Sequence, residues 1–178
     1  PPGHHAEPSR GMGFCLFNNV AVGAAHARQN HGINHVAVVD FDVHHGNGTQ
    51  AAFWSDPNVM VASSHEYPFY PGTGAQEERG VGNIFNIPLA KMSGSKEFRQ
   101  GFEKVVFPAL QEFSPDLIII SAGFDAHARD PLANIRLQDE DFEWITNKLL
   151  DIAGEYAEGR IVSSLEGGYD LDALASSV

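Results

Sequence analysis

Residues 36–48 read VAVVDFDVHHGNG, and this stretch decides the fold class. It opens with four consecutive apolar residues and closes with a run rich in Asp, His and Gly. A short, continuous apolar run is typical of a strand that is buried on both faces of a parallel sheet. Ligands bind at the carboxyl ends of such strands, so the polar run after Val39 is a candidate functional site.

The rest of the chain alternates short β-branched runs with amphipathic segments. The former predict strands, and apolar stripes at helical spacing predict helices. We expect strands at residues 36–41, 59–63, 84–89, 117–121 and 161–165, and helices at residues 18–30, 95–113 and 139–156. This alternation, without a repeat or a linker, predicts one α/β domain over residues 1–178, in which a mostly parallel sheet lies between two helical layers.

The composition excludes several classes of protein. With 43% hydrophobic and 19% charged residues, the chain is typical of a globular protein. A formal net charge of −12 argues against direct binding to nucleic acid and suits a cationic partner, although solubility alone also accounts for it. No apolar stretch reaches the roughly 20 residues of a membrane span. The single cysteine, Cys15, cannot form an internal disulfide, so we expect a reducing, cytoplasmic location.

Two strand ends carry candidate metal ligands. Asp40, Asp42 and His44 are spaced two residues apart, which on an extended segment points their side chains to one side. Asp125 follows the predicted strand at residues 117–121. Asp and His are good zinc ligands, and a catalytic zinc typically takes three protein ligands plus water. The first cluster supplies only two good ligands at reachable geometry, so Asp125 completes that number, although a polar turn or a helix cap would explain the same residue types.

Two further motifs suit catalysis. His4 and His5 are adjacent, and imidazoles with neutral-range pKa values are candidates for a general base and a general acid. Tyr169 lies in the sequence EGGY after the last predicted strand, where its hydroxyl group can donate a hydrogen bond to a developing oxyanion. Taken alone, a pair of surface histidines and an ordinary glycine turn are the simpler interpretations.

Six motifs in a fixed order give the chain a specific resemblance. PPGHHAE, GFCLFNN, VVDFDVHHGNGTQ, YPGTG, AGFDAH and LEGGYD together resemble the histone deacetylase and acetylpolyamine amidohydrolase superfamily, over nearly the whole chain. The sequences PPGHH and GNGTQ are similar to the corresponding motifs of class II enzymes and their bacterial relatives. The resemblance implies the three-layer α/β/α fold that deacetylases share with arginases.

The resemblance also implies roles for individual residues. It assigns zinc, or iron(II), to Asp42, His44 and Asp125, and structural potassium to Asp40, the backbone of residues 42 and 44, Ser63 and Ser64. His4 and His5 match the catalytic histidines, oriented by Asp40 and by the neutral side chain of Asn47, respectively. Tyr169 matches the tyrosine that polarises the acetyl carbonyl. Phe14, with Gly13 beside it, and Tyr70 match the walls of the channel for the acyl-lysine stem. His45 and His127 are expected to be structural.

The function implied is a zinc-dependent deacetylase that releases acetate and a free amine from acetyl-lysine in proteins or from acetylated polyamines. Three alternatives stay open: a catalytically inactive acyl-lysine binding module, a hydrolase of another small amide, and a ureohydrolase with two manganese ions. The last would need a second carboxylate-rich motif beside Asp125, which the sequence lacks. An oligomer is possible.

The two ends of the chain suggest a fragment. It opens at PPGHH without an initiator Met and stops within a pattern at residues 175–178. The resemblance implies further strands and helices on both sides. We therefore expect a catalytic core truncated at both ends, less stable alone than within the longer protein.

Overall fold

A computed structural model describes residues 2–178, which contain one five-stranded sheet. All strand pairs are parallel and the strand order is β3-β2-β1-β4-β5. The strands are β1 (Val36–Asp40), β2 (Val59–Glu66), β3 (Ile84–Leu89), β4 (Leu117–Ala122) and β5 (Ile161–Leu165). All five predicted strands are therefore present, and β2 is longer than predicted.

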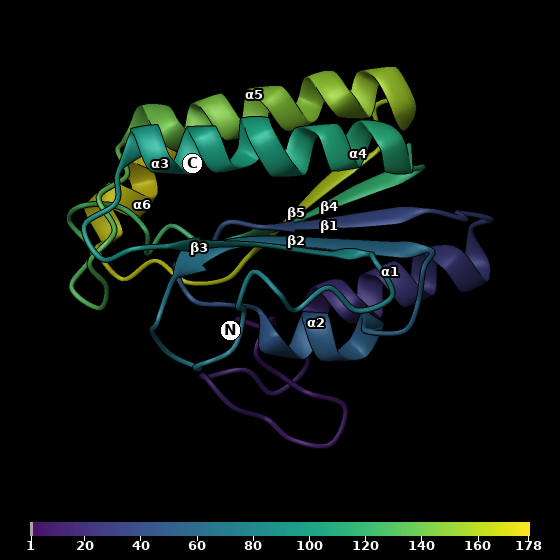
Figure 1. Cartoon of the computed structure of the whole chain (residues 1–178), viewed down its shortest axis with the longest axis horizontal. Coiled ribbons are helices and arrows are strands. Elements are labelled where there is room, and N and C mark those ends of the chain that lie inside the picture. Colours follow the sequence, from purple (N-terminus) through teal and green to yellow (C-terminus); the bar gives the residue numbers. More distant parts are fainter. Residues whose placement is uncertain (1) are drawn as a thin grey trace.

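Helices cover both faces of the sheet, as Figure 1 shows. On one face lie α1 (Asn19–Asn30) and α2 (Asn47–Phe53); on the other lie α3 (Ser95–Gly101), the π-helix η1 (Phe102–Val106), α4 (Phe107–Phe113) and α5 (Asp139–Tyr156). The short helix α6 (Leu171–Ser177) follows β5 and contacts α5. The predicted three-layer α/β/α architecture is confirmed.

Two apolar cores explain why the central strands read as continuous apolar runs. Alternate residues of a strand point to opposite faces. In β1, Ala37 and Val39 belong to the core under α3–α5, whereas Val36 and Val38 belong to the core under α1. Both sets are fully buried. Because each face of the sheet is covered, neither face of β1 tolerates polar residues until Asp40, where the strand ends.

The sequence pattern did not predict the helices α2 and α6. The helix predicted at residues 95–113 is present but contains the π-helical turn η1. The start of α2, Asn47-Gly48, has the composition of a turn. It is nevertheless helical, since the backbone amides of Gly48 and Thr49 donate to the carbonyl of His4 at 3.0 and 3.1 Å. That acceptor lies more than forty residues earlier in the chain, so no local pattern reveals it.

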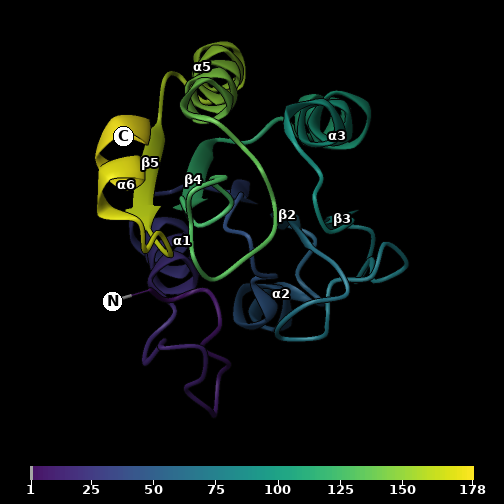
Figure 2. The ribbon, with the colours of Figure 1, turned by 90° about the vertical axis from the view of Figure 1, so that its left-hand side faces the viewer.

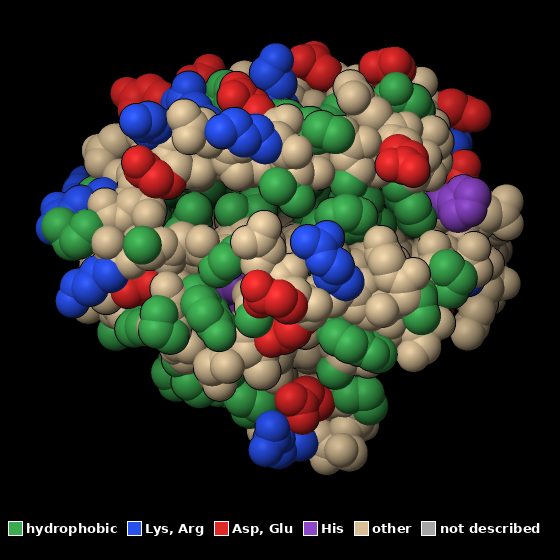
Figure 3. Space-filling model, viewed as in Figure 1, with side chains coloured by type: hydrophobic (Ala, Val, Ile, Leu, Met, Phe, Trp, Pro, Cys, Tyr) green, Lys and Arg blue, Asp and Glu red, His purple; other side chains and the backbone are tan. Residues whose placement is uncertain are grey.

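The loops that leave the carboxyl ends of the strands gather at one edge of the sheet, which faces the viewer in Figure 2. On the face drawn in Figure 3, Lys and Arg side chains are mixed with Asp and Glu, with hydrophobic side chains between them. Among the described helices, none combines the length and apolar character needed to cross a membrane.

Candidate active site

The carboxyl ends of two neighbouring strands bring the three predicted metal ligands together. Asp42 and His44 follow β1, and Asp125 follows β4, which pairs with β1. Ligand atoms of the three side chains all lie within 4.8 Å of one another. His44 Nδ1 is 3.1 Å from both Asp42 Oδ1 and Asp125 Oδ2.

Backbone amides fix the other oxygen of each carboxylate. Gly167 N donates to Asp42 Oδ2 at 2.7 Å, and Val43 N donates to Asp125 Oδ1 at 2.9 Å. The remaining oxygens are thereby turned toward His44. Gly167 cannot carry a side chain here, because an added Cβ would lie 2.2 Å from Asp125 Oδ2. This arrangement orients one oxygen of each carboxylate as a metal donor.

The charge balance of the cluster fits a bound cation. Asp40, Asp42 and Asp125 are each only 1% exposed. Within residues 2–178, their ion pairs involve histidines alone. Burial and the negative charge of Asp42 raise the pKa of Asp125 to about 7. Burial opposes charge on His44, but hydrogen bonds to Asp125 and Asp42 raise its pKa to about 10. A divalent metal ion would replace this proton and neutralise the carboxylates.

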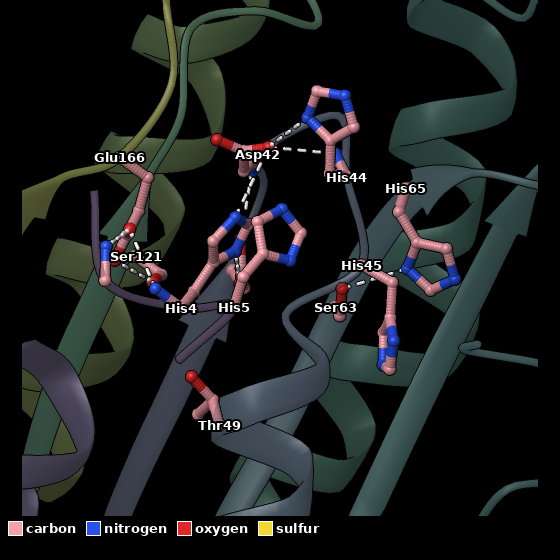
Figure 4. A network of polar contacts seen from close by, with 12 residues as sticks. His4, His5, Asp42, His44, His45, Thr49, Ser63, His65, Ser121 and Glu166 are labelled. Atoms are coloured by element: carbon pink, nitrogen blue, oxygen red, sulfur yellow. Dashed lines mark hydrogen bonds and ion pairs between the residues drawn. The ribbon is translucent and has the colours of Figure 1, made fainter. Parts of the chain in front are cut away.

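His4 is held by a carboxylate behind it. Its Nδ1 donates to Asp40 Oδ2 at 2.8 Å, which leaves Nε2 3.7 Å from Asp42 Oδ1 (Figure 4). Asp40 uses its other oxygen to accept from Asp42 N. Burial disfavours the charged imidazole, but the charges of Asp40 and Asp42 outweigh it and raise the pKa of His4 well above its ordinary value.

His5 has a neutral partner instead. Asn47 donates from Nδ2 to Glu7 Oε1 at 2.8 Å, so its Oδ1 accepts from His5 Nδ1 at 2.8 Å. Nε2 of His5 therefore keeps its lone pair. Burial and the positive charge of His4 lower the pKa of His5 to about 4. Gly13 lies directly against this ring, since an added Cβ would meet His5 Cδ2 at 2.2 Å.

A pocket of about 430 Å³ opens over these groups. Aromatic rings form part of its wall: Phe14 lies 6.4 Å from Tyr169, and Tyr70 lies 5.1 Å from His5, between ring centroids. Phe14 and Tyr70, the two predicted wall residues, thus line the pocket. The rest of its lining consists of Pro2, His4, His5, Gly13, Asp42, His44, Leu132, Gly167 and Tyr169. An aromatic-walled pocket with few convergent polar groups is typical of a small-ligand site.

Two of the side chains assigned to potassium, Asp40 and Ser63, are hydrogen-bonded to other groups of the protein. Ser63 pairs in register with Asp40, and both Ser63 and Ser64 are buried. However, Ser63 Oγ lies 2.9 Å from His65 Nδ1, and Asp40 uses its oxygens for His4 and for a backbone amide.

Several residues that hold the site were not singled out in the sequence. Glu166 binds the backbone of Gly3 and His4, and Asp130 Oδ2 accepts from Tyr169 N at 2.8 Å. Phe69 stacks on His44 with a centroid distance of 5.5 Å. Glu166 lies within the LEGGYD motif, where no role of its own was predicted for it, and Phe69 directly precedes the YPGTG motif; these positions were the available signal.

Comparison with known proteins identifies the family of the chain. The chain is 47% identical to "Histone deacetylase 10, chloroplastic" of Oryza sativa subsp. japonica, over all of this chain and 41% of that protein. It is 44% identical to "Histone deacetylase-like amidohydrolase" of Pseudomonas aeruginosa, over 95% of this chain and 46% of that protein. The solved structure "Crystal Structure of HDA15 HD domain" matches with a TM-score of 0.91 and 42% identity, over 99% of this chain and 52% of that chain.

These matches bear on location and family. The chain spans about half the length of these relatives or less. The name of the rice protein places that relative in the chloroplast, and the cytoplasmic location of the present chain stays a prediction. The family profile described as "Histone deacetylase domain" matches residues 1–178. The chain therefore belongs to the histone deacetylase family.

Proposed function

We propose that the chain forms the catalytic centre of a metal-dependent deacetylase acting on acetyl-lysine side chains or acetylated polyamines. One observation carries the proposal: three metal-ligand side chains, two histidines with fixed hydrogen-bond partners and one tyrosine meet around an aromatic-walled pocket. Membership of the histone deacetylase family supports the reaction class.

Asp42, His44 and Asp125 would hold zinc, or iron(II), which accepts the same nitrogen and oxygen donors. When bound, such an ion activates a water molecule and polarises the amide carbonyl. A potassium ion near Asp40, Ser63 and Ser64 is a secondary proposal, which rests on the resemblance of the sequence and on the register of β1 and β2.

We assign the proton transfers to His5 and an electrostatic role to His4. His5 is neutral near pH 7 and accepts the proton of the attacking water on Nε2, because its Nδ1 proton is directed to Asn47. The same proton then passes to the departing amine. His4, charged and bonded to Asp40, stabilises negative charge that develops beside Asp42.

Tyr169 donates a hydrogen bond to the carbonyl oxygen as that oxygen gains charge. Burial and the negative charges of Asp125 and Asp42 raise the pKa of Tyr169 above its ordinary value, which keeps the hydroxyl protonated. Phe14, Gly13 and Tyr70 enclose the methylene stem of the substrate. The net charge of −12 suits a substrate that carries positive charge.

The test measures bound zinc together with turnover of an acetyl-lysine peptide and of an acetylated polyamine. Wild type should hold stoichiometric zinc and release acetate, and Asp125→Ala should lose both. Asp151→Ala, an exposed aspartate on α5, is the matched control and should retain both. Zinc bound without turnover of either substrate would favour another amide substrate or a role in acyl-lysine binding.

A further inference from the structure

Glu166, the residue directly after β5, joins the end of the sheet to the segment that carries the tandem histidines. Its carboxylate is buried, with 6% of the residue exposed. Oε2 accepts from Gly3 N at 2.5 Å and from His4 N at 3.0 Å, while Oε1 accepts from Ser121 Oγ at 2.7 Å. Figure 4 shows Glu166, Ser121 and His4 side by side, with the bonds between them.

These contacts complete the fixation of His4. Its backbone amide donates to Glu166, and its backbone carbonyl accepts from Gly48 and Thr49 at the start of α2. Its ring Nδ1 donates to Asp40. With both sides of the backbone held, the ring has little freedom to swing away from Asp40 or from the metal ligand Asp42. Loss of the Glu166 contact would free the amide side of this arrangement.

We propose that Glu166 is a positioning residue for the reaction, which it serves through His4. The inference rests on the proposed deacetylase function and extends it. Glu166 is not among the residues that line the described pocket, and its oxygens are engaged by the two amides and the Ser121 hydroxyl. It therefore acts by the placement of its hydrogen-bond acceptors rather than by contact with substrate.

Two conservative variants separate placement from charge. In Glu166→Gln the charge is lost, but the side-chain oxygen still reaches both amides and its NH2 group can donate to Ser121 Oγ. In Glu166→Asp the charge is kept, but the carboxylate is withdrawn by one methylene group. Glu166→Ala removes all three bonds. Glu112→Gln, on the exposed surface of α4, is the matched control.

In the metal-loaded protein, we expect Glu166→Ala and Glu166→Asp to lower kcat by about 10- to 100-fold, because small displacements of a catalytic group are costly. KM and bound zinc should change little. Glu166→Gln should retain most of kcat, as should Glu112→Gln. A fold-stabilising role alone would lower the melting temperature without this split between kcat and KM.

A second readout does not depend on activity. The proton on His4 Nδ1, bonded to Asp40, should give a low-field proton NMR signal, assigned by its loss in His4→Ala. The signal should shift or broaden in Glu166→Asp and persist in Glu166→Gln. If wild type is inactive but the signals behave in this way, the proposed function fails and the positioning role stands.

Three results would overturn the positioning role. The first is wild-type kcat and an unchanged signal in Glu166→Asp. The second is the reverse order of the two variants, with Glu166→Asp competent and Glu166→Gln impaired, which would show that the charge matters. The third is an equal loss of zinc in both variants, which would assign Glu166 to the metal site. Should Glu166→Ala not fold, the Gln and Asp variants still decide among these outcomes.

Discussion

Each residue of the tandem histidine pair has a different electrostatic environment, although the two rings are 4.1 Å apart. His4 faces the carboxylate of Asp40, and His5 faces the amide of Asn47. The charge of Asp40 raises the pKa of His4, whereas the hydrogen bond to the neutral Asn47 does not offset the burial and the charge of His4 that lower the pKa of His5. Two chemically identical side chains thereby differ in charge, and neither Asp40 nor Asn47 lines the pocket.

Tyr169 can be tested by removal of its hydroxyl group alone. We expect Tyr169→Phe to lower kcat by about 100-fold or more, as for loss of one oxyanion donor, with bound zinc retained. Tyr156→Phe, on α5 and away from the pocket, is the matched control. Wild-type kcat in Tyr169→Phe would remove the tyrosine from the mechanism.

Zinc binding should weaken as the pH falls. The pKa values of about 10 for His44 and about 7 for Asp125 mean that protons must leave before the metal binds. For each proton released, the apparent affinity should drop by about tenfold per pH unit. Competition with a chelator at pH 6, 7 and 8 measures this slope. An affinity that does not vary with pH would contradict the assigned ligands.

The three proposed metal ligands could be singled out from the sequence because they follow apolar strands. The rule that parallel strands end at a common edge predicts that Asp42, His44 and Asp125 lie close together, and the resemblance to the family assigns them to zinc. A role for Glu166 could not be found in this way, since the two backbone amides that it binds lie more than 160 residues earlier in the chain. Its role follows from a long-range contact that neither spacing nor composition reveals.

At the scale of elements, the connection between β5 and α6 holds several residues of the site in place. Successive residues of this segment contact His4 through Glu166, Asp42 through Gly167, and Asp130 through Tyr169. The segment therefore links His4, the proposed metal ligand Asp42 and the proposed oxyanion donor Tyr169. A displacement of its backbone should affect all three.

Gly167→Ala tests this connection. An added Cβ would lie 2.2 Å from Asp125 Oδ2 and 2.7 Å from Asp42 Oδ2, so both carboxylates must move. We therefore expect zinc affinity to fall by about 10- to 100-fold, as when a residue that supports metal ligands is changed. Gly154→Ala is the control: its Cβ would meet nothing within 4 Å in α5, so it should stabilise the fold by about 1 kcal/mol. Unchanged zinc affinity in Gly167→Ala would argue against the connection.

Elements were predicted well where burial dictates the pattern. Both faces of β1 are covered, so its apolar run could only be a buried strand. The helix α2 was missed because Gly48 is required by packing: an added Cβ would lie 2.2 Å from Ala6 O. Its glycine marks a close contact with the histidine segment rather than a turn.

At the scale of the whole molecule, a buried polar network lies beside the site. His45 bonds to Thr73 and Gln50, and His65 bonds to Ser63 and to the carbonyl of Gly74. Because a carbonyl only accepts, His65 Nε2 carries the proton and its Nδ1 accepts from Ser63. Burial and the nearby His65 lower the pKa of His45 to about 2, so both imidazoles are neutral in the folded protein at pH 7.

This network should make the fold sensitive to acid. Burial lowers the pKa of His65 to about 4, against the hydrogen bond to Gly74 and the charge of Glu78. The unfolded chain gains this proton near its ordinary pKa of about 6.5, so the unfolded state binds more protons between these values. The contribution of His65 to stability is therefore present above about pH 6.5 and is lost as the pH falls, by about 1 kcal/mol at pH 5.5.

Urea unfolding of wild type and His65→Gln at pH 7.5 and 5.5 isolates this contribution from those of other groups. The loss of unfolding free energy between the two pH values should be smaller in His65→Gln by about 1 kcal/mol. His26→Gln removes an exposed histidine from α1 and should lose as much as wild type. An equal loss in wild type and His65→Gln would mean that His65 is already charged in the folded protein. The carbonyl of Gly74 would then accept from an imidazolium ion, and acid would not weaken this hydrogen bond.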